Sequence, residues 1–241
     1  VRLEQRLDTA LLIRSKSGVE LTREGKLLAT RIRGFLLEWD SIEAAIKHER
    51  EEPAGRFTLG CHVSIALNWL PAHLPGFLKR WPRLELEISH DLSRRITEQV
   101  VSHQLDFGLV INPVRHPDLV LIDLGKDVFT FWGRDEALSD TVLYDPDLLQ
   151  SQTLLRKLEK RGHRFTRRFT SSSLDLLGRM AANGAGTAIL PSHLALQMRP
   201  SLRKPRGDSP ALPDTLCLAY RADAQRSPGA RALISALKAI G

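Results

Sequence analysis

The stretch LLIRSKSGVELTREGKLL, residues 11–28, places a short basic turn between two apolar runs and then begins a helical pattern. Gly18 can adopt the positive φ that a tight hairpin requires, and Thr22 is a favourable N-cap for the helix. We therefore expect a β-hairpin that carries Arg14 and Lys16 and is joined directly to a helix. The basic loop fits two interpretations, an ordinary surface hairpin and a loop that lies against a phosphate backbone.

The helix that follows, residues 23–52, carries an apolar stripe at three- and four-residue spacing. At 1.5 Å per residue, about 30 residues make a rod of about 45 Å, which is too long to bury its stripe against the short N-terminal segment. We expect the helix to pack against a second copy of the chain in coiled-coil fashion, with packing on its own domain as the alternative. The stripe consists of Leu27, Leu28, Ile32, Phe35, Leu36, Trp39, Ile42 and Ile46.

The composition is that of a globular protein, since 42% of the 241 residues are hydrophobic and 26% are charged. The net charge of +7 favours a polyanionic or small anionic partner. Cys61 and Cys217 lie far apart without C-x-x-C spacing, which argues against a disulfide framework or a structural zinc site. No apolar run approaches the roughly 20 residues of a membrane span, and the N-terminus lacks the apolar core of a signal peptide. We therefore expect a cytoplasmic protein without a metal, a cofactor or a membrane partner.

Strand and helix patterns alternate beyond Pro53 and Gly55, which end the long helix. Strand patterns at RFTLGCHV, RLELEISHD and DFGLVI are separated by helical patterns, and LVLIDLGKDVFTFWG adds further strand. A second set begins with TVLYD near residue 141 and ends with GTAILP, after which TLCLAYR and a terminal helix complete the chain. This order predicts an α/β fold with largely parallel strand pairing.

The motifs of common enzymes are missing from the sequence. It contains no G-x-S-x-G, H-E-x-x-H or P-loop pattern. The G-x-G of NGAGTAILP, residues 183–191, follows a helix and leads into a strand, which is the reverse of a dinucleotide-binding fingerprint. His62 lies beside Cys61 and close to Ser64, but neighbours on a strand point to opposite faces and no orienting acid is evident. We therefore expect a protein that is not an enzyme.

Polar side chains follow several of the expected strands. Ser64, Ser93, Asn112 and the serines at residues 171–173 all lie where a strand ends. Each serine alone is explained as an N-cap. Together they crowd the carboxyl edge of a parallel sheet, where open α/β folds bind ligands, and so predict a small polar or anionic ligand. The basic run at residues 156–168 is either a solvated helix face or a surface for an acidic partner.

The chain resembles the LysR-type transcriptional regulators over its whole length. RLEQRLDTALLIRSKSGVELTREGKLL is similar to the end of that family's winged helix-turn-helix and the start of its linker helix. LPGFLKRWPRLELEI, LDFGLVI and SSLDLLGRMAANGAGTAILP resemble its effector domain, a two-lobed unit like a periplasmic binding protein. Asp8, Leu12 and Glu24 depart from the family's usual Gly, Phe and Ala. The family's first two helices and most of its recognition helix would precede Val1, and we expect truncation or disorder upstream.

The resemblance implies a domain division and a set of site residues. Residues 1–22 would be the end of the recognition helix and the wing, residues 23–52 the linker and dimerisation helix, residues 56–133 with 211–241 lobe I, and residues 134–210 lobe II. Effector contacts carry over to Ser64, Ser93, Thr130, Ser172 and Ser173, to which the strand-end argument adds Asn112. DNA contacts carry over to Arg2, Arg6, Arg14 and Lys16.

The resemblance also implies a function. We expect a DNA-binding transcriptional regulator whose lobes respond to a small-molecule effector. The expected partners are promoter DNA through the complete N-terminal domain, a second copy bound through residues 23–52, a homotetramer, and RNA polymerase as a further candidate. The alternative from another class is a solute-binding protein of the same two-lobed fold that binds no DNA.

Overall fold

The N-terminal part of the chain consists of a short helix, a hairpin and a long helix. The computed structural model describes residues 2–15, 18–46, 53–207 and 209–239. Strands β1 (Leu12–Ser15) and β2 (Gly18–Leu21) pair antiparallel after α1 (Arg2–Leu7), and Gly18 has a φ of 137°. The Gly25 N–H donates to Thr22 Oγ1 at 2.9 Å, so Thr22 caps α2 (Arg23–Ile46). The predicted hairpin and helix start are confirmed, and the predicted end of the helix lies outside the described residues.

The remaining strands form one mixed eight-stranded sheet in the order β4-β3-β5-β10-β6-β9-β7-β8. Pairing is parallel at both outer parts of the sheet, as predicted, whereas β10 and β6 in the middle run antiparallel to their neighbours. The strands are β3 (Gly55–Cys61), β4 (Leu84–His90), β5 (Phe107–Ile111), β6 (Leu119–Trp132), β7 (Thr141–Tyr144), β8 (Arg167–Thr170), β9 (Thr187–Pro191) and β10 (Leu212–Arg221).

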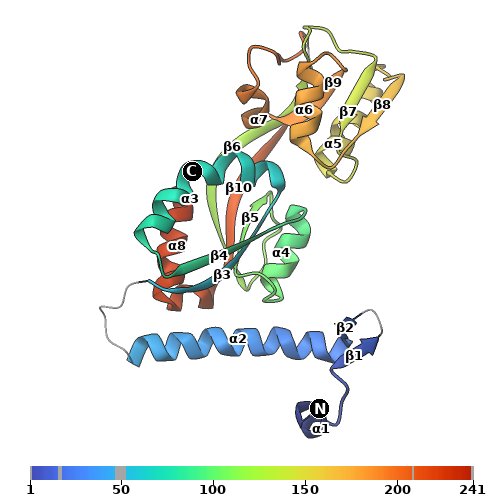
Figure 1. The fold of residues 1–241 in the computed structure, drawn as a ribbon. Helices are drawn as coiled ribbons and strands as arrows, with labels where there is room; N and C mark the ends of the chain where they lie inside the picture. Colours follow the sequence, from blue (N-terminus) through green and yellow to red (C-terminus); the bar gives the residue numbers. More distant parts are fainter. Residues whose placement is uncertain (1, 16–17, 47–52, 208, 240–241) are drawn as a thin grey trace.

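The sheet is divided into two lobes that have separate apolar cores (Figure 1). In lobe I, α3 and α8 cover one face of the sheet and α4 covers the other. In lobe II, α5, α6 and α7 surround the second core. The helices are α3 (Val63–Arg80), α4 (Ser93–Val101), α5 (Leu149–Lys160), α6 (Leu174–Ala182), α7 (Ser192–Gln197) and α8 (Pro228–Lys238), with a 3-10 turn at Ala222–Arg226. The short α7 and the 3-10 turn were not predicted from the sequence.

Two long strands, β6 and β10, pass from one lobe into the other. Leu124 of β6 packs in the core of lobe I, whereas Phe129, Phe131 and Trp132 pack in the core of lobe II. The expected boundary between residues 133 and 134 is therefore too late, because the chain has already crossed before Phe129. Sequence patterns placed the whole apolar run in one lobe because a strand that serves two cores shows no break in its hydrophobicity.

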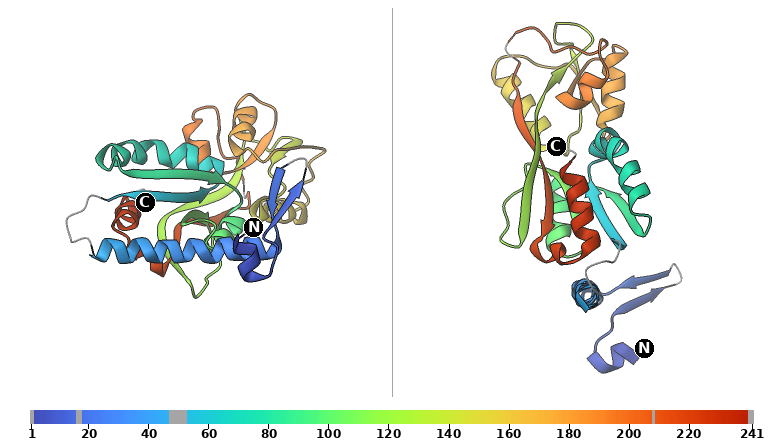
Figure 2. Two further views of the ribbon diagram at one scale, coloured as in Figure 1. Left: turned by 60° about the horizontal axis from the view of Figure 1, so that its bottom comes forward. Right: turned by 90° about the vertical axis from the view of Figure 1, so that its left-hand side faces the viewer.

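Helix α2 lies beneath lobe I, at the end remote from lobe II (Figures 1 and 2). Its described contacts with lobe I are largely polar: Arg226 Nη1 donates to both carboxylate oxygens of Glu38 at 2.5 and 2.6 Å, and Arg33 Nη1 donates to the Gln104 carbonyl at 3.2 Å. The apolar stripe stays uncovered, which argues against the alternative that it packs on its own domain. Its exposed members are Leu27, Ile32, Phe35, Leu36, Trp39 and Ile42. None of the described helices has the length and apolarity needed to cross a bilayer.

Candidate functional site

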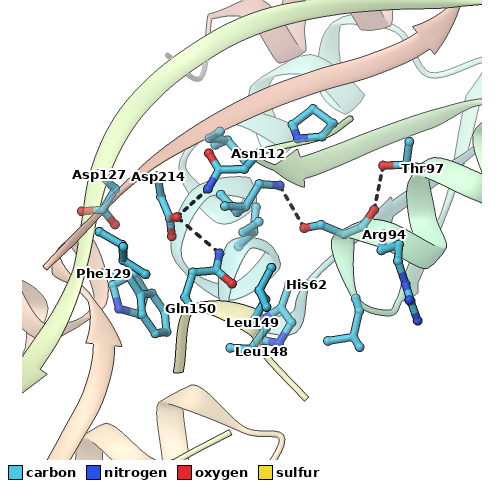
Figure 3. Close-up of a pocket in the computed structure, with 18 of the residues that line it drawn as sticks. His62, Arg94, Thr97, Asn112, Asp127, Phe129, Leu148, Leu149, Gln150 and Asp214 are labelled. Atoms are coloured by element: carbon cyan, nitrogen blue, oxygen red, sulfur yellow. Dashed lines mark hydrogen bonds between the residues drawn. The ribbon is translucent and has the colours of Figure 1, made fainter. Parts of the chain in front are cut away.

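A cleft of about 1110 Å³ lies between the two lobes. Lobe I contributes the start of α3, one side of α4 and the loop after β5, while lobe II contributes residues around the start of α5 and the start of α7. The crossover strands β6 and β10 also line it (Figure 3). A cavity of this size, lined by both halves of a protein, is typical of small-molecule sites. Its apolar lining includes Ile65, Trp69, Phe129, Leu148, Leu149 and Leu212.

Asp214 is the most buried charged side chain that lines the cleft, with 3% of its surface exposed. Its Oδ1 accepts hydrogen bonds from Asn112 Nδ2 at 2.7 Å and from Gln150 Nε2 at 3.3 Å. Asn112 belongs to lobe I and Gln150 to lobe II, so this carboxylate joins the two lobes (Figure 3). Burial raises the pKa of Asp214 above its ordinary value, against the lowering effect of the two amides.

A second carboxylate, Asp127, lies directly opposite Asp214 in the antiparallel register of β6 and β10. Its Oδ2 is 2.6 Å from His193 Nδ1, and the Val128 N–H donates to its Oδ1 at 2.7 Å. Burial alone would raise the pKa of Asp127, but the bonds from His193 and Val128 outweigh it and hold that pKa below the ordinary value. The Trp69 ring of lobe I packs edge-on against the His193 ring of lobe II, with 5.8 Å between centroids.

Three of the predicted effector residues line this cleft: Ser64, Ser93 and Asn112. Ser64 Oγ lies 3.0 Å from His62 Nδ1, and Ser93 Oγ accepts the Ile111 N–H at 2.9 Å. Asn112 has a φ of 47°, and its Oδ1 accepts the Thr215 N–H at 2.9 Å. Three of the predicted strand-end residues therefore share one cavity, although each already serves the local structure, whereas the serines at residues 171–173 do not line it.

The other three predicted effector residues, Thr130, Ser172 and Ser173, are not among the residues that line the cleft. Thr130 is buried, and its hydroxyl donates to the Pro210 carbonyl at 3.0 Å, because β6 has already entered lobe II at this point. Ser173 caps α6 by accepting the Leu176 N–H at 3.2 Å, and Ser172 is exposed. In this structure Ser173 has the role of an N-cap.

Three of the predicted DNA-contacting residues belong to described elements of the N-terminal part. Arg2 and Arg6 are on α1, and Arg14 is on β1. The Arg6 side chain is exposed, the side chains of Arg2 and Arg14 are not described, and Lys16 lies outside the described residues. Glu4 connects the two elements, since its Oε1 accepts the N–H groups of Leu11 and Leu12 at 2.8 and 3.1 Å, which lowers the pKa of Glu4.

His62 forms a second polar centre at the edge of the cleft. Its Nδ1 accepts the Ser64 N–H at 3.2 Å and so caps α3. Burial lowers the pKa of His62, while the negative charges of Asp145 and Asp175 in lobe II act in the opposite direction. Asp145 is only 1% exposed, and its Oδ1 accepts the Asp147 N–H at 2.9 Å. Among the described residues, no group of three His, Cys, Asp or Glu side chains is arranged to hold a metal ion.

Sequence reasoning missed the charged and aromatic residues that dominate the floor of the cleft. A signal was present for two of them, because Asp127 and Asp214 are acids inside largely apolar strand runs, in KDVFTF and PDTLCL. A charged residue in a strand that is otherwise buried generally has a specific partner or a function. His193 is the second residue after the strand GTAILP, so it occupies a strand-end position like that of the predicted serines.

Comparison with known proteins explains this architecture. A family model described as the LysR substrate binding domain matches residues 50–240. This chain belongs to the LysR-type family. The expected resemblance and the two-lobed α/β fold are thereby confirmed.

Two similar proteins have names that describe transcriptional regulators. The HTH-type transcriptional regulator BbuR of Bordetella bronchiseptica is 31% identical over 49% of this LysR-type chain, and the match spans 37% of BbuR. YofA of Bacillus subtilis is 26% identical over 78% of the chain and 68% of its own length. The match thus spans little more than a third of BbuR.

Solved structures share the fold at low sequence identity. ArgP from Mycobacterium tuberculosis has a TM-score of 0.75 at 15% identity, with 99% of the chain and 84% of ArgP covered. Full-length LysG from Corynebacterium glutamicum, solved with bound effector Arg, has a TM-score of 0.68 at 16% identity and covers 99% of the chain and 85% of LysG. Each of these similarities shows that the chain shares the fold of that protein, N-terminal elements included.

Proposed function

We propose that this LysR-type chain regulates transcription by binding a small polar effector in the cleft between its lobes and thereby changing how the protein binds promoter DNA. The observation that carries the proposal is the cleft itself, which is lined by both lobes and by the two strands that connect them. A molecule held there touches both lobes at once. LysG, a protein of the same fold, was solved with a small effector bound, which supports a small ligand for this chain.

The proposed mechanism is a shift between open and closed arrangements of the lobes. A ligand that contacts both lobes binds the closed arrangement more tightly and so raises its population. Contacts that already span the cleft, Asp214 with Gln150 and Trp69 with His193, would tighten or separate as the lobes move. Because Glu38 of α2 is paired with Arg226 of lobe I, movement of lobe I would be passed to α2.

The proposed partners follow from the exposed stripe of α2 and from the family. We propose that α2 pairs with α2 of a second copy and that two such dimers form a tetramer in the cytoplasm. Promoter DNA would be bound by the complete N-terminal domain, with Arg2, Arg6, Arg14 and Lys16 near the phosphate backbone. RNA polymerase is a further partner in this proposal.

The test is fluorescence anisotropy on the DNA that flanks the gene, with this chain compared with the product of the complete reading frame. We expect the complete product to bind tightly, with an affinity that falls steeply as salt rises. Charge reversal at Arg14 and Lys16 should weaken that binding on every DNA sequence. If neither protein binds at low salt, the proposal fails, and a solute-binding protein of the same fold becomes the better account.

A further inference from the structure

The floor of the cleft carries two like charges side by side. Asp127 and Asp214 are directly opposite in the antiparallel pairing of β6 and β10, so their side chains point to the same face, toward the cleft. Figure 3 shows both carboxylates at the same end of the pocket. Like charges directly opposite on neighbouring strands are destabilising unless a cation compensates them.

Among the described residues, only one of the two carboxylates has a basic side chain as its partner. Asp127 is paired with His193 at 2.6 Å. Asp214 is bonded to two neutral amides, both through Oδ1, and within the described part of the chain it forms no ion pair and its Oδ2 has no hydrogen-bond partner. A buried carboxylate with one oxygen left over favours a charged or strongly donating N–H partner.

The basic residues that line the cleft do not fill this role. Arg94, Arg115 and Lys126 line it without an ion pair to Asp214 in the described structure. Arg94 lies at the opposite side of the pocket from Asp214 (Figure 3). The cleft also contains aromatic surface, because Trp69 and Phe129 line it. Aromatic faces attract cations.

We propose that the effector carries a cationic, N–H-rich group, such as an amine, amidine or guanidinium, that binds to Asp214 Oδ2, with an apolar portion against Trp69, Phe129 and Leu149. The inference rests on the proposed function, in which the effector occupies this cleft. It excludes a carboxylate or phosphate of the ligand from the floor, because such a group would face two carboxylates, of which only Asp127 is paired with a histidine.

Three phenylethyl probes that differ in their polar head group test the charge preference on the wild-type protein. Isothermal titration calorimetry at pH 7 would compare 2-phenylethylamine, 2-phenylethanol and 3-phenylpropionate. We expect the amine to bind about tenfold or more tightly than the alcohol, since a charge-assisted hydrogen bond replaces a neutral one, and the carboxylate to bind least. Equal affinities for amine and alcohol, or no binding of the amine at millimolar concentration, would overturn the proposal.

Two matched variants assign the preference to its residue. Asp214→Asn keeps the shape of the side chain and removes the charge, and we expect it to lose most of the amine's advantage over the alcohol. Glu85→Gln removes an exposed acid of lobe I that does not line the cleft, and we expect the amine's affinity to change less than about twofold. An equal loss in both variants would contradict a specific role for Asp214. Tight binding of the carboxylate would leave the cleft as the effector site while refuting its charge assignment.

Discussion

At the scale of single residues, His62 couples a helix cap to protonation. Its Nδ1 accepts the Ser64 N–H at the start of α3, and a protonated Nδ1 can no longer accept it. Burial lowers the pKa of His62 below 6.5, against opposing charges on Asp145 and Asp175 and with a small further lowering from His90. In the unfolded chain the imidazole regains its ordinary pKa, so acid favours unfolding at this site.

We therefore expect His62 to make the protein less stable in acid. Because the folded pKa is below the unfolded value, the stability is fully present above about pH 6.5 and is lost as the pH falls through the folded pKa, at about 1.4 kcal/mol per unit of pKa difference. The measurement is urea unfolding at pH 7.5 and pH 5.5. The variant His62→Asn, which keeps a good N-cap, should lose less unfolding free energy between these pH values than the wild type.

The comparison with wild type isolates His62 from other histidines. His103, whose pKa is also lowered by burial, is present in both proteins and contributes equally to each. A variant with the same pH dependence as the wild type would show that His62 is not responsible for the loss in acid.

At the scale of elements, most of the apolar stripe of α2 is exposed, with no covering element among the residues that the structure describes. Phe35 is 64% exposed and Trp39 is 54% exposed. Contiguous exposed apolar surface of this kind usually marks an interface. We expect Phe35→Glu to convert the protein from dimer to monomer, because a charge in a helix–helix seam has no solvent and no partner. Light scattering at several protein concentrations measures the mass.

Lys26→Glu provides the control for the dimer. Lys26 is exposed on α2 and is not part of the stripe. Lys26→Glu changes the charge more than Phe35→Glu does, yet it should leave the mass unchanged. A wild-type monomer, or dissociation by Lys26→Glu as well, would argue against pairing through the stripe.

The elements show what local sequence can predict in this chain. The hairpin, α2 and most strands follow from periodicity, Gly18 and Thr22, because each of these signals acts within a few residues. Ser64, Ser93 and Asn112 could be placed together because parallel strands end at a common edge of the sheet. The six-residue α7 is too short to show a helical period, and it carries into place His193, which the prediction lacked.

The pairing of Asp127 with Asp214 was not predictable in the same way. The two residues become neighbours only through the register of β6 against β10, and register between strands far apart in sequence depends on the whole packed fold. The same strands explain why Thr130 lies away from the cleft, since the crossing into lobe II precedes it.

At the scale of the whole molecule, β6 and β10 make the two lobes one cooperative structure. They pair from Leu212 opposite Phe129 to Arg221 opposite Leu119, and each supplies side chains to both cores. Unfolding of one lobe would remove the packing partners of one part of each strand and so loosen the pairing that both lobes share. We therefore expect both lobes to unfold in one transition, although their cores are separate.

A glycine in lobe II, in a backbone conformation that other residues rarely adopt, provides a test of this cooperativity. Gly186 has a φ of 153°, and an added Cβ would lie 2.5 Å from the Thr141 carbonyl oxygen, so Gly186→Ala should cost about 2–3 kcal/mol. For a cooperative unit of this size, the whole calorimetric transition would move down by about 5–10 °C at a fixed protein concentration. Gly76→Ala, on the exposed face of α3 where a Cβ meets nothing within 4 Å, should instead raise the midpoint slightly. Two resolved transitions, of which Gly186→Ala lowers only one, would mean that the lobes unfold independently and that the crossover strands only tether them.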